Sequence, residues 1–399
     1  MIILHIPSWY ASPQSPLAGV FIKEQIMAYA TFYPDDKNYI ADFYGKRISL
    51  MISQPLDSGK KIFEFFRSPK QSVNPILSNL TELQTKFVAG NEKVFGPLLD
   101  NIFDAVESQL IYLISRKDKP DILHAHVSYP GGIVAQRLSK KYNIPYVVSE
   151  QSGVALLHAA FTTYGLKDAI LSCFKNASAV SALSTFHKAE LQKLGIENIS
   201  VIPNLVNEEI FVIPAEKSKG EYFTFFSLAN LKESKGIKDL LLSIVKVVVS
   251  RKNVRFRIGG GGNESNYFMQ MAIDLKIDKC IDWLGEIGRG AAAAEFKNCD
   301  AFVLPSKSES FGVVYIEALA CGKPVVATNC GGPADSVNNA NGLLVEVGDI
   351  DAIANAMIYV MDNIETFDGE KIREDVLSKF SRKVVTSQMH DFYLQLNHS

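Results

Sequence analysis

Short hydrophobic runs alternate with amphipathic segments along most of the chain. This alternation is typical of βαβ units, in which helices connect buried parallel strands. In the first half of the chain, the pattern predicts strands at 2–6, 39–43, 49–53, 62–66, 121–125, 145–149, 177–181 and 199–202. It predicts helices at 20–31, 93–116, 130–142, 165–175 and 184–194. We therefore expect a doubly wound α/β domain in this half.

The pattern is interrupted at Pro203 and Asn204 and by a Lys-rich polar stretch at 214–221, and then it resumes. Predicted strands follow at 222–228, 254–259, 281–284, 300–304 and 324–328, with helices at 236–250, 264–275, 289–298 and 311–321. A chain of 399 residues is long for one domain. We predict two doubly wound domains, 1–205 and 206–380, and a C-terminal amphipathic helix within 381–399. Ligands bind beyond the carboxyl ends of such strands, so an interdomain cleft is expected.

Composition excludes several other classes of protein. The net charge of −2 gives no support to a nucleic-acid partner. The five cysteines are odd in number and form no C-x-x-C pair, so we expect reduced, mostly buried thiols in a cytoplasmic protein. The amino terminus lacks a basic leader and reaches Pro7 too early for a secretory signal. The apolar stretch 240–249 is about half the length needed to span a bilayer, so we expect any membrane contact to be peripheral.

The segment 305–327 contains two glutamates, Glu309 and Glu317, with seven residues between them. It follows an apolar strand and opens a helix near Phe311, so the turn lies where a strand ends and a helix begins. Backbone N–H groups and the helix dipole make such a turn an anion site. Glu309 could then hold sugar hydroxyls, and Glu317 a ribose diol. The alternative is a helix-charge residue at Glu309 and a solvated face at Glu317.

This segment resembles the E-x7-E motif of retaining family 4 glycosyltransferases with the GT-B fold. The resemblance includes the Ser-Phe-Gly between the glutamates and the Glu-Ala-Leu-Ala-Cys-Gly-Lys-Pro-Val-Val-Ala that follows. It implies that Glu309 binds hydroxyls of the donor sugar and that Glu317 binds the ribose. It also implies donor contacts, chiefly from backbone amides, at Ser310, Phe311, Gly312 and Val313.

A second segment, Asn230-Leu-Lys-Glu-Ser-Lys235-Gly236, follows the predicted strand 222–228. It resembles the phosphate clamp of the same family, G-R-L-x-x-x-K-G, in which Lys235 matches the lysine that grips the diphosphate. Asn230 replaces the expected arginine, and Ala229 replaces the first glycine. Asn230 can donate hydrogen bonds to the donor but carries no charge. A surface loop lysine is the alternative interpretation of Lys235.

His124 and His126 end a predicted strand and point to the same side. No third ligand lies nearby in the sequence, so we expect no metal. The family resemblance implies that His126 hydrogen-bonds the donor sugar; a hydrogen-bonded core histidine is the alternative. Gly19 matches a glycine loop that lies beside the diphosphate in the family, although a structural turn glycine is also consistent with its position.

Three other motifs are weaker. Glu150 resembles the first residue of a family Glu-His segment, but Gln151 replaces the histidine, so an acceptor-side role stays open. The glycine run 259–262 lacks the third glycine of a dinucleotide site, and we predict a strand-to-helix turn near the nucleotide base. Asp349 and Asp351 imitate a D-x-D motif but directly precede a helical pattern, so we predict helix capping.

The resemblance is strongest over 200–399 and implies a retaining, metal-independent hexosyltransferase without a cofactor. It places the acceptor on the first domain and the nucleotide sugar on the second, and it returns the C-terminal helix to the first domain. These residues do not separate UDP from GDP; we expect a UDP-sugar. We expect a glycan or lipid-linked acceptor in cell-surface polysaccharide synthesis, at the inner face of the membrane. The alternatives are a silent nucleotide-sugar or glycan-binding protein, and a GT-B epimerase or phosphorylase.

Overall fold

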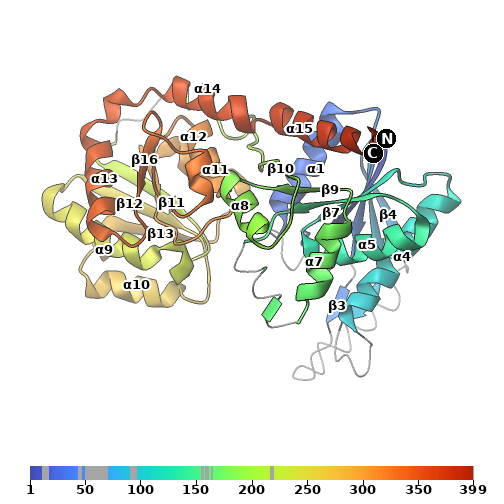
Figure 1. Ribbon diagram of the computed structural model, residues 1–399. Coiled ribbons are helices and arrows are strands. Elements are labelled where there is room, and N and C mark those ends of the chain that lie inside the picture. The colour runs from blue at the N-terminus through green and yellow to red at the C-terminus, as the bar shows by residue number, and fades with distance from the viewer. Residues whose placement is uncertain are drawn as a thin grey trace. The chain divides into compact units, whose positions relative to one another are not determined.

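The structure is a computed structural model that describes residues 1–10, 18–43, 47–49, 71–89, 97–153, 157, 161–162, 165–215 and 220–398. The chain folds into two compact units, each built on its own sheet (Figure 1). Unit 1 comprises Met1–Leu183, Lys188–Ile202 and Thr386–Ser399, and unit 2 comprises Ser184–His187 and Pro203–Val385. The strand predicted at 62–66 and most of the one at 49–53 lie outside the described residues.

The main sheet of unit 1 has eight strands in the order β10-β9-β8-β7-β1-β2-β5-β4. They are β1 (Ile2–Pro7), β2 (Lys37–Asp42), β4 (Gln71–Leu77), β5 (Leu80–Thr85), β7 (Ile122–His126), β8 (Tyr146–Glu150), β9 (Ala179–Ala182) and β10 (Ile199–Val201). All neighbours are parallel except β4 and β5, whose antiparallel hairpin the hydrophobic pattern did not predict. Two short strands, β3 (Arg47–Ser49) and β6 (Phe87–Ala89), form a separate parallel pair.

Helices cover both faces of this sheet, as a doubly wound domain requires. They are α1 (Val20–Phe32), α4 (Leu98–Ser115), α5 (Ile133–Tyr142), α7 (Lys167–Asn176), α8 (Thr185–Lys193) and α15 (Arg382–Leu394), with a short π-helical turn, η1 (Ser128–Gly132). A large apolar core joins the sheet to α4, α5 and α7, for example through Leu110, Leu138 and Phe174. A smaller core that includes Ile22 and Ile26 joins the sheet to α1. Because both faces are covered, strands such as β7 are buried along their whole length.

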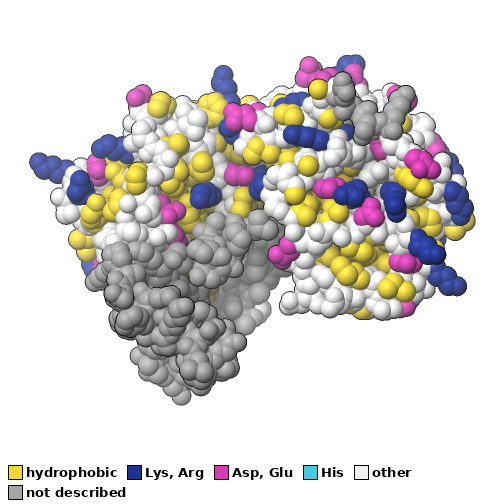
Figure 2. Space-filling model, turned by 180° about the vertical axis from the view of Figure 1, so that it is seen from behind, with side chains coloured by type: hydrophobic (Ala, Val, Ile, Leu, Met, Phe, Trp, Pro, Cys, Tyr) yellow, Lys and Arg dark blue, Asp and Glu magenta, His cyan; other side chains and the backbone are white. Residues whose placement is uncertain are grey.

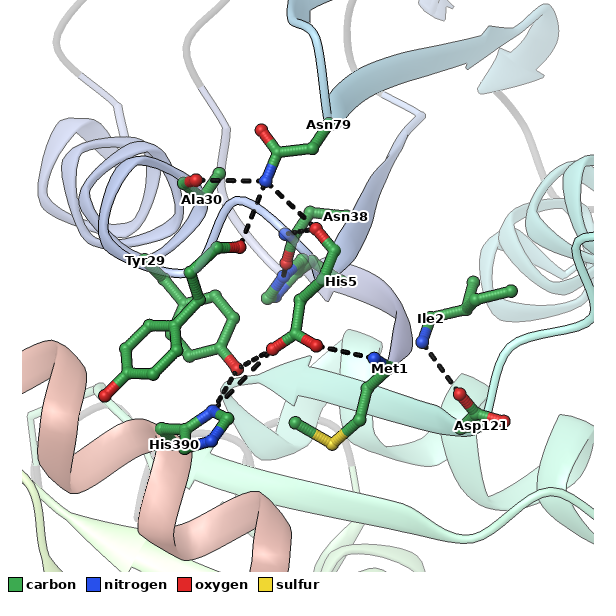
Figure 3. A network of polar contacts seen from close by, with 11 residues as sticks. Met1, Ile2, His5, Tyr29, Ala30, Asn38, Asn79, Asp121 and His390 are labelled. Atoms are coloured by element: carbon green, nitrogen blue, oxygen red, sulfur yellow. Dashed lines mark hydrogen bonds and ion pairs between the residues drawn. The ribbon is translucent and has the colours of Figure 1, made fainter.

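Most of the C-terminal helix α15 belongs to unit 1, and a polar network fastens it there (Figure 3). The hydroxyl of Tyr29 donates a hydrogen bond of 2.7 Å to Asp36 and lies 3.0 Å from Nδ1 of His390 on α15. That imidazole lies 3.7 Å from the carboxylate of Asp36 and stacks on the ring of Tyr33 at 4.1 Å. Because His390 is held by Asp36, Tyr29 and Tyr33 together, the network fixes which face of α15 packs against unit 1.

Unit 2 contains a six-stranded parallel sheet in the order β13-β12-β11-β14-β15-β16. The strands are β11 (Phe223–Leu228), β12 (Val254–Gly259), β13 (Ile281–Gly285), β14 (Ala301–Leu304), β15 (Val325–Thr328) and β16 (Gly342–Val345). Its helices are α9 (Ile237–Ser250), α10 (Ser265–Asp274), α11 (Arg289–Asn298), α12 (Val313–Ala320), α13 (Ile350–Asp362) and α14 (Gly369–Phe380). The strand order reverses between β11 and β14, where open α/β sheets bind their ligands.

Several predictions about local chemistry can be checked directly. All five cysteines are free and only Cys280 is not buried, as predicted. The carboxylate of Asp349 accepts a hydrogen bond from the backbone of Ala352 at 2.9 Å, which confirms that it caps α13. Among the described helices, none combines the length and apolar character needed to cross a membrane. On the face shown in Figure 2, basic and acidic side chains are interspersed, in keeping with the small net charge.

Candidate active site

Two loops of unit 2 meet at the reversal point of its sheet. Residues 229–236 follow β11 and include the short helical turn η2 (Glu233–Lys235), while residues 305–312 follow β14. The backbone N–H of Lys307 donates to the carbonyl of Ser234 at 2.9 Å. A Cβ on Gly236 would lie 1.7 Å from the carbonyl oxygen of Pro305, and its φ of +68° also favours glycine. Gly236 therefore permits the close approach of the two loops.

The loops bring together two predicted site residues that lie far apart in the sequence. Nζ of Lys235 is 2.7 Å from Oε1 of Glu309, and their side chains are 23% and 11% exposed. The hydroxyl of Ser306 donates to the same Glu309 oxygen at 2.8 Å. The amide of Gly332 donates to the carbonyl of Glu309 at 2.8 Å, so the backbone of this glutamate is also anchored. The lysine and the glutamate thus form a fixed, partly exposed charge pair.

The first turn of α12 begins four residues after Glu309. Gly312 caps the helix in a left-handed conformation, and Val313 is the first helical residue. The ring of Phe311 is buried and packs edge-on against Phe380 at 5.5 Å, while the carbonyl of Ser310 accepts a hydrogen bond from Ser184 at 2.5 Å. The first N–H groups of a helix have no acceptor within the helix and carry partial positive charge. The start of α12 could therefore bind an anion, and Lys235 contacts Glu309 in the turn that leads into this helix.

Glu317 lies in the second turn of α12 and is only 1% exposed. The alternative of a solvated face for Glu317 is therefore wrong, because this part of the helix is buried among apolar neighbours. Nη1 of Arg289, the first residue of α11, forms an ion pair with the Glu317 carboxylate. The guanidinium also lies 5.0 Å above the ring of Phe211. Arg289 belongs to no motif and was not predicted, because only the packing of α11 beside α12 brings it to Glu317.

Asn230 is exposed on the lysine loop, beside the glycine run 259–262. The amide of Leu231 donates to the carbonyl of Gly261 at 2.7 Å, and the run leads from β12 into α10 as the predicted strand-to-helix turn. A Cβ on Gly262 would come within 2.6 Å of the Asn230 side-chain oxygen. The glycine run therefore packs closely against the lysine loop and holds it by a backbone hydrogen bond.

A second ion pair joins the two loops, this time with the lysine on the β14 loop and the glutamate on the β11 loop. Nζ of Lys307 on the β14 loop pairs with Glu233 on the β11 loop and lies 3.8 Å from Asp239. The hydrogen bond that Lys307 donates to the Glu233 carboxylate raises the pKa of Lys307. The loops are therefore linked by Lys235 with Glu309 and by Glu233 with Lys307. Sequence reasoning did not single out this second pair.

His126 lies in unit 1 at the end of β7 and is fully buried. Its Nε2 is hydrogen-bonded to Nδ1 of His5 at 3.1 Å, and its Nδ1 to the side-chain oxygen of Gln151 at 3.3 Å. Burial lowers the pKa of His126 well below its ordinary value, so the ring is neutral. This placement matches the alternative of a hydrogen-bonded core histidine. Contact with the donor sugar stays a prediction, and it would require the bond to Gln151 to open.

The structure supplies a third histidine where the sequence showed none. His5 on β1 lies opposite His124 in parallel register, and candidate ligand atoms of His5, His124 and His126 lie within 4.8 Å of one another. However, each ring nitrogen already has a protein partner. His5 also bonds Asn38 at 3.1 Å, and His124 bonds Tyr393 and Ser149 at 2.6 and 2.8 Å. A metal ion would have to displace these bonds, so the cluster fits a hydrogen-bonded core better than a metal site.

Two further predicted positions have structural roles that are visible in unit 1. Gly19 caps α1, and a Cβ there would lie 2.3 Å from the carbonyl oxygen of Trp9. The buried carboxylate of Glu150 accepts backbone hydrogen bonds from Ser128 and Ser152 at 3.0 and 2.9 Å, and so ties together the loops after β7 and β8. Donor binding by Gly19 and an acceptor-side role for Glu150 stay predictions.

Comparisons with known proteins agree with this arrangement. The family described as Glycosyl transferases group 1 matches residues 208–374, and Glycosyltransferase Family 4 matches residues 80–210. Sucrose-phosphate synthase from Thermosynechococcus elongatus superposes with a TM-score of 0.75 at 19% identity, covering 100% of this chain and 99% of that one. The two units thus have the fold of the GT-B transferases. The chain belongs to the family 4 type of GT-B glycosyltransferases.

Three relatives illustrate the range of similar sequences, and two of them are named for different reactions. N-acetyl-alpha-D-glucosaminyl L-malate synthase of Bacillus anthracis is 26% identical over 70% of this chain and 76% of its own. UDP-Gal:alpha-D-GlcNAc-diphosphoundecaprenol alpha-1,3-galactosyltransferase of Escherichia coli is 25% identical over 76% of this chain and 88% of its own. An uncharacterised glycosyltransferase of Methanocaldococcus jannaschii is 27% identical over 61% of this chain and 66% of its own.

Proposed function

We propose that this glycosyltransferase is a retaining hexosyltransferase that uses a nucleotide diphosphate donor without a metal ion. The observation that carries the proposal is the contact of Lys235 with Glu309, 2.7 Å apart, beside the start of α12. A departing diphosphate needs positive charge near its oxygens, and the lysine and the helix N–H groups supply it. A carboxylate next to them can hold the hydroxyls of the sugar that is transferred.

The reaction breaks the bond between the anomeric carbon and the diphosphate oxygen and forms a bond to the acceptor oxygen on the same face. The acceptor proton ends on the departing diphosphate, so no protein nucleophile is required. Negative charge grows on the diphosphate as the bond breaks, and Lys235 and the amides at 311–313 stabilise it. Losing one such preorganised donor typically costs about 100- to 1000-fold in rate.

The ion pair explains how donor binding would rearrange the site. Glu309 accepts hydrogen bonds from both Lys235 and Ser306. When a phosphate oxygen binds Lys235, the Glu309 carboxylate becomes available to the sugar hydroxyls. Asn230 would add a neutral hydrogen bond, and Glu317 would accept bonds from the ribose.

The proposal for the donor nucleotide and the acceptor is supported by the name of one relative. We propose a UDP-sugar and a glycan or lipid-linked acceptor that binds unit 1, in cell-surface polysaccharide synthesis at the cytoplasmic face of the membrane. The Escherichia coli relative is named for UDP-Gal and for a sugar linked to diphosphoundecaprenol. A lipid-linked acceptor would need only peripheral contact between the enzyme and the membrane.

The test is a thermal-shift and slow-hydrolysis screen of UDP- and GDP-sugars in the presence of EDTA. Wild type is compared with Glu309→Ala and with Glu233→Ala, which removes the other inter-loop carboxylate. We expect one nucleotide family to stabilise the wild type. We also expect release of free nucleotide to fall about 100-fold or more in Glu309→Ala and less than tenfold in Glu233→Ala.

Other outcomes would favour the alternatives. Stabilisation without turnover on any acceptor would indicate a silent binder, whereas an epimerised donor or a dependence on phosphate would indicate an epimerase or a phosphorylase. Activity that EDTA abolishes would contradict metal independence. The anomeric configuration of the product, measured by NMR, decides between retention and inversion.

A further inference from the structure

The buried ion pair of Arg289 and Glu317 adds a residue to the nucleotide site that no motif contains. We propose that Arg289 is a positioning residue, which holds the carboxylate of Glu317 ionised and oriented toward the two ribose hydroxyls of the donor. This inference rests on the proposed function, because it takes Glu317 as the ribose ligand. Arg289 would act through Glu317 and would not touch the reacting atoms.

Burial explains why Glu317 needs a cationic partner. The residue is 1% exposed on α12, and a buried carboxylate without a partner takes up a proton. A protonated carboxyl group is a poorer acceptor for a diol than a carboxylate. The guanidinium of Arg289 stays charged at all working pH values and therefore keeps Glu317 in its accepting form.

The position of the Arg289 side chain is fixed from a second direction. Its guanidinium lies 5.0 Å from the ring of Phe211, which is fully buried. The Phe211 backbone is held in turn, because Nη1 of Arg373 donates to its carbonyl at 2.5 Å. An ion pair that is also stacked on an immobile ring loses less side-chain freedom than a surface pair. Arg289 can therefore orient the carboxylate as well as neutralise it.

The pair is compatible with a bound ribose. A carboxylate accepts up to about four hydrogen bonds, so the bond from Arg289 does not use all of the accepting capacity of Glu317. Because Glu317 is 1% exposed, a ribose would reach it only after neighbouring groups move. The ribose does not change during sugar transfer, and its contacts are equally strong in the ground state and the transition state. Loss of Arg289 should therefore raise the donor KM and leave kcat nearly unchanged.

The experiment measures the binding of UDP and 2′-deoxy-UDP, or of GDP and 2′-deoxy-GDP if the wild type prefers guanine. The variants are Arg289→Met, Arg289→Lys, Glu317→Gln and the double variant Arg289→Met with Glu317→Gln. Arg257→Met is the matched control. Arg257 lies on β12 and forms a two-bond ion pair with Glu295 of α11, the helix that also carries Arg289. We expect Arg289→Met to weaken binding of the ribonucleotide about 10- to 100-fold.

Discrimination between the two sugars separates positioning from a merely structural role. The wild type should prefer the ribonucleotide, and Arg289→Met should lose most of that preference, while Arg257→Met keeps it. The double variant should bind no more weakly than Glu317→Gln alone, because both changes disable one group. The preference of Arg289→Lys for the ribonucleotide should fall between those of wild type and Arg289→Met. If the methionine variant does not fold, the lysine variant tests the inference.

Two results would overturn the inference. One is an unchanged affinity for the ribonucleotide in Arg289→Met. The other is an equal loss for both nucleotides, with discrimination intact, which would mean that Arg289 only supports the fold. A wild type that binds neither UDP nor GDP would instead reject the proposed function, so the two failures are distinguishable.

Discussion

In the main sheet of each unit the strand order reverses, between β7 and β1 in unit 1 and between β11 and β14 in unit 2. The polar groups at these two points differ in burial. In unit 1, His5 on β1 and His126 on β7 are fully buried and hydrogen-bonded to each other. In unit 2, Lys235 after β11 and Glu309 after β14 are charged and partly exposed. Topology alone therefore does not make a ligand site. The state of the side chains at that point decides what it can do.

The difference follows from where the polar groups sit. The histidines lie on the strands themselves, where burial strips their water and drives them to the neutral form. The lysine and the glutamate lie on loops beyond the strands, next to a helix start, where charge is retained. We expect changes in the histidine cluster to affect mainly stability and changes in the loops to affect mainly turnover, since sites that serve function are seldom optimised for stability.

The largest effect is expected at Gly236, where the two loops touch. In Gly236→Ala the new Cβ would lie 1.7 Å from the Pro305 carbonyl oxygen, and the residue would keep a positive φ. We expect a loss of roughly 3–5 kcal/mol in unfolding free energy of unit 2 from the clash and the strain together. Urea unfolding, followed by circular dichroism, measures it.

Gly285→Ala is the matched control, because Gly285 has a φ of +65° but no atom within 4 Å of its added Cβ. It should cost only the backbone strain, about 1–2 kcal/mol. Equal losses in the two variants would mean that the loops separate easily. The close approach of the loops would then be no part of what holds Lys235 beside Glu309.

A slightly smaller effect is expected from the lysines of the two loops. Lys235→Met should reduce turnover about 100- to 1000-fold, equivalent to about 2.7–4 kcal/mol of transition-state stabilisation, because it removes a charge at the leaving group. Lys307→Met removes a charge of the same type that pairs with Glu233, and it should cost less than tenfold. Steady-state kinetics with the preferred donor measures both variants.

The unfolding midpoints of the two lysine variants should lie close together, which would separate catalysis from folding. A turnover loss that is as large in Lys307→Met as in Lys235→Met would contradict the assignment of Lys235 as the phosphate ligand. It would show that both cations act on the diphosphate, and Lys307 would then stand in for the arginine that Asn230 replaces.

Most of the parallel sheet could be predicted because its strands are continuous hydrophobic runs. The hairpin of β4 and β5 was missed, since β4 begins with the polar pair Gln71-Ser72, lacks regular alternation and contains Pro75, and these features weaken a strand signal. The short strand β16 and the helix α14 also had no prediction. The strands β4 and β16 are short or weakly patterned and are stabilised by pairing with a neighbouring strand. In α14, Ile372, Val376 and Phe380 have helical spacing, so this helix could have been predicted from the sequence.

The residues of the candidate site also fall into a predicted group and a missed group. Glu309 and Lys235 were predicted because each lies in a contiguous motif, and the structure places them in contact. Arg289 and His5 were missed because neither belongs to a motif. Arg289 meets Glu317 only through the packing of α11 on α12, and His5 meets His124 and His126 only because β1 pairs with β7. Contacts of this kind are set by tertiary structure, which one sequence does not reveal.

The smallest effect concerns the pH dependence of the histidine cluster. Burial lowers the pKa of His5 from 6.5 to about 4 in the folded protein, whereas the unfolded chain keeps the ordinary value. Between those values the unfolded state binds more protons, so stability is complete above about pH 6.5 and falls as the pH falls. One such group costs up to about 2 kcal/mol between pH 6.5 and 5. His5→Gln should remove that share of the slope in urea unfolding.

Asn38→Ala is the control for this prediction, because it breaks the same hydrogen bond to His5 but leaves the imidazole in place. Its stability should fall at every pH, while the slope between pH 6.5 and 5 stays at least as steep as in the wild type. If His5→Gln kept the wild-type slope, the histidines would be charged or solvated in the folded protein. The contrast between a neutral core in unit 1 and a charged site in unit 2 would then be lost.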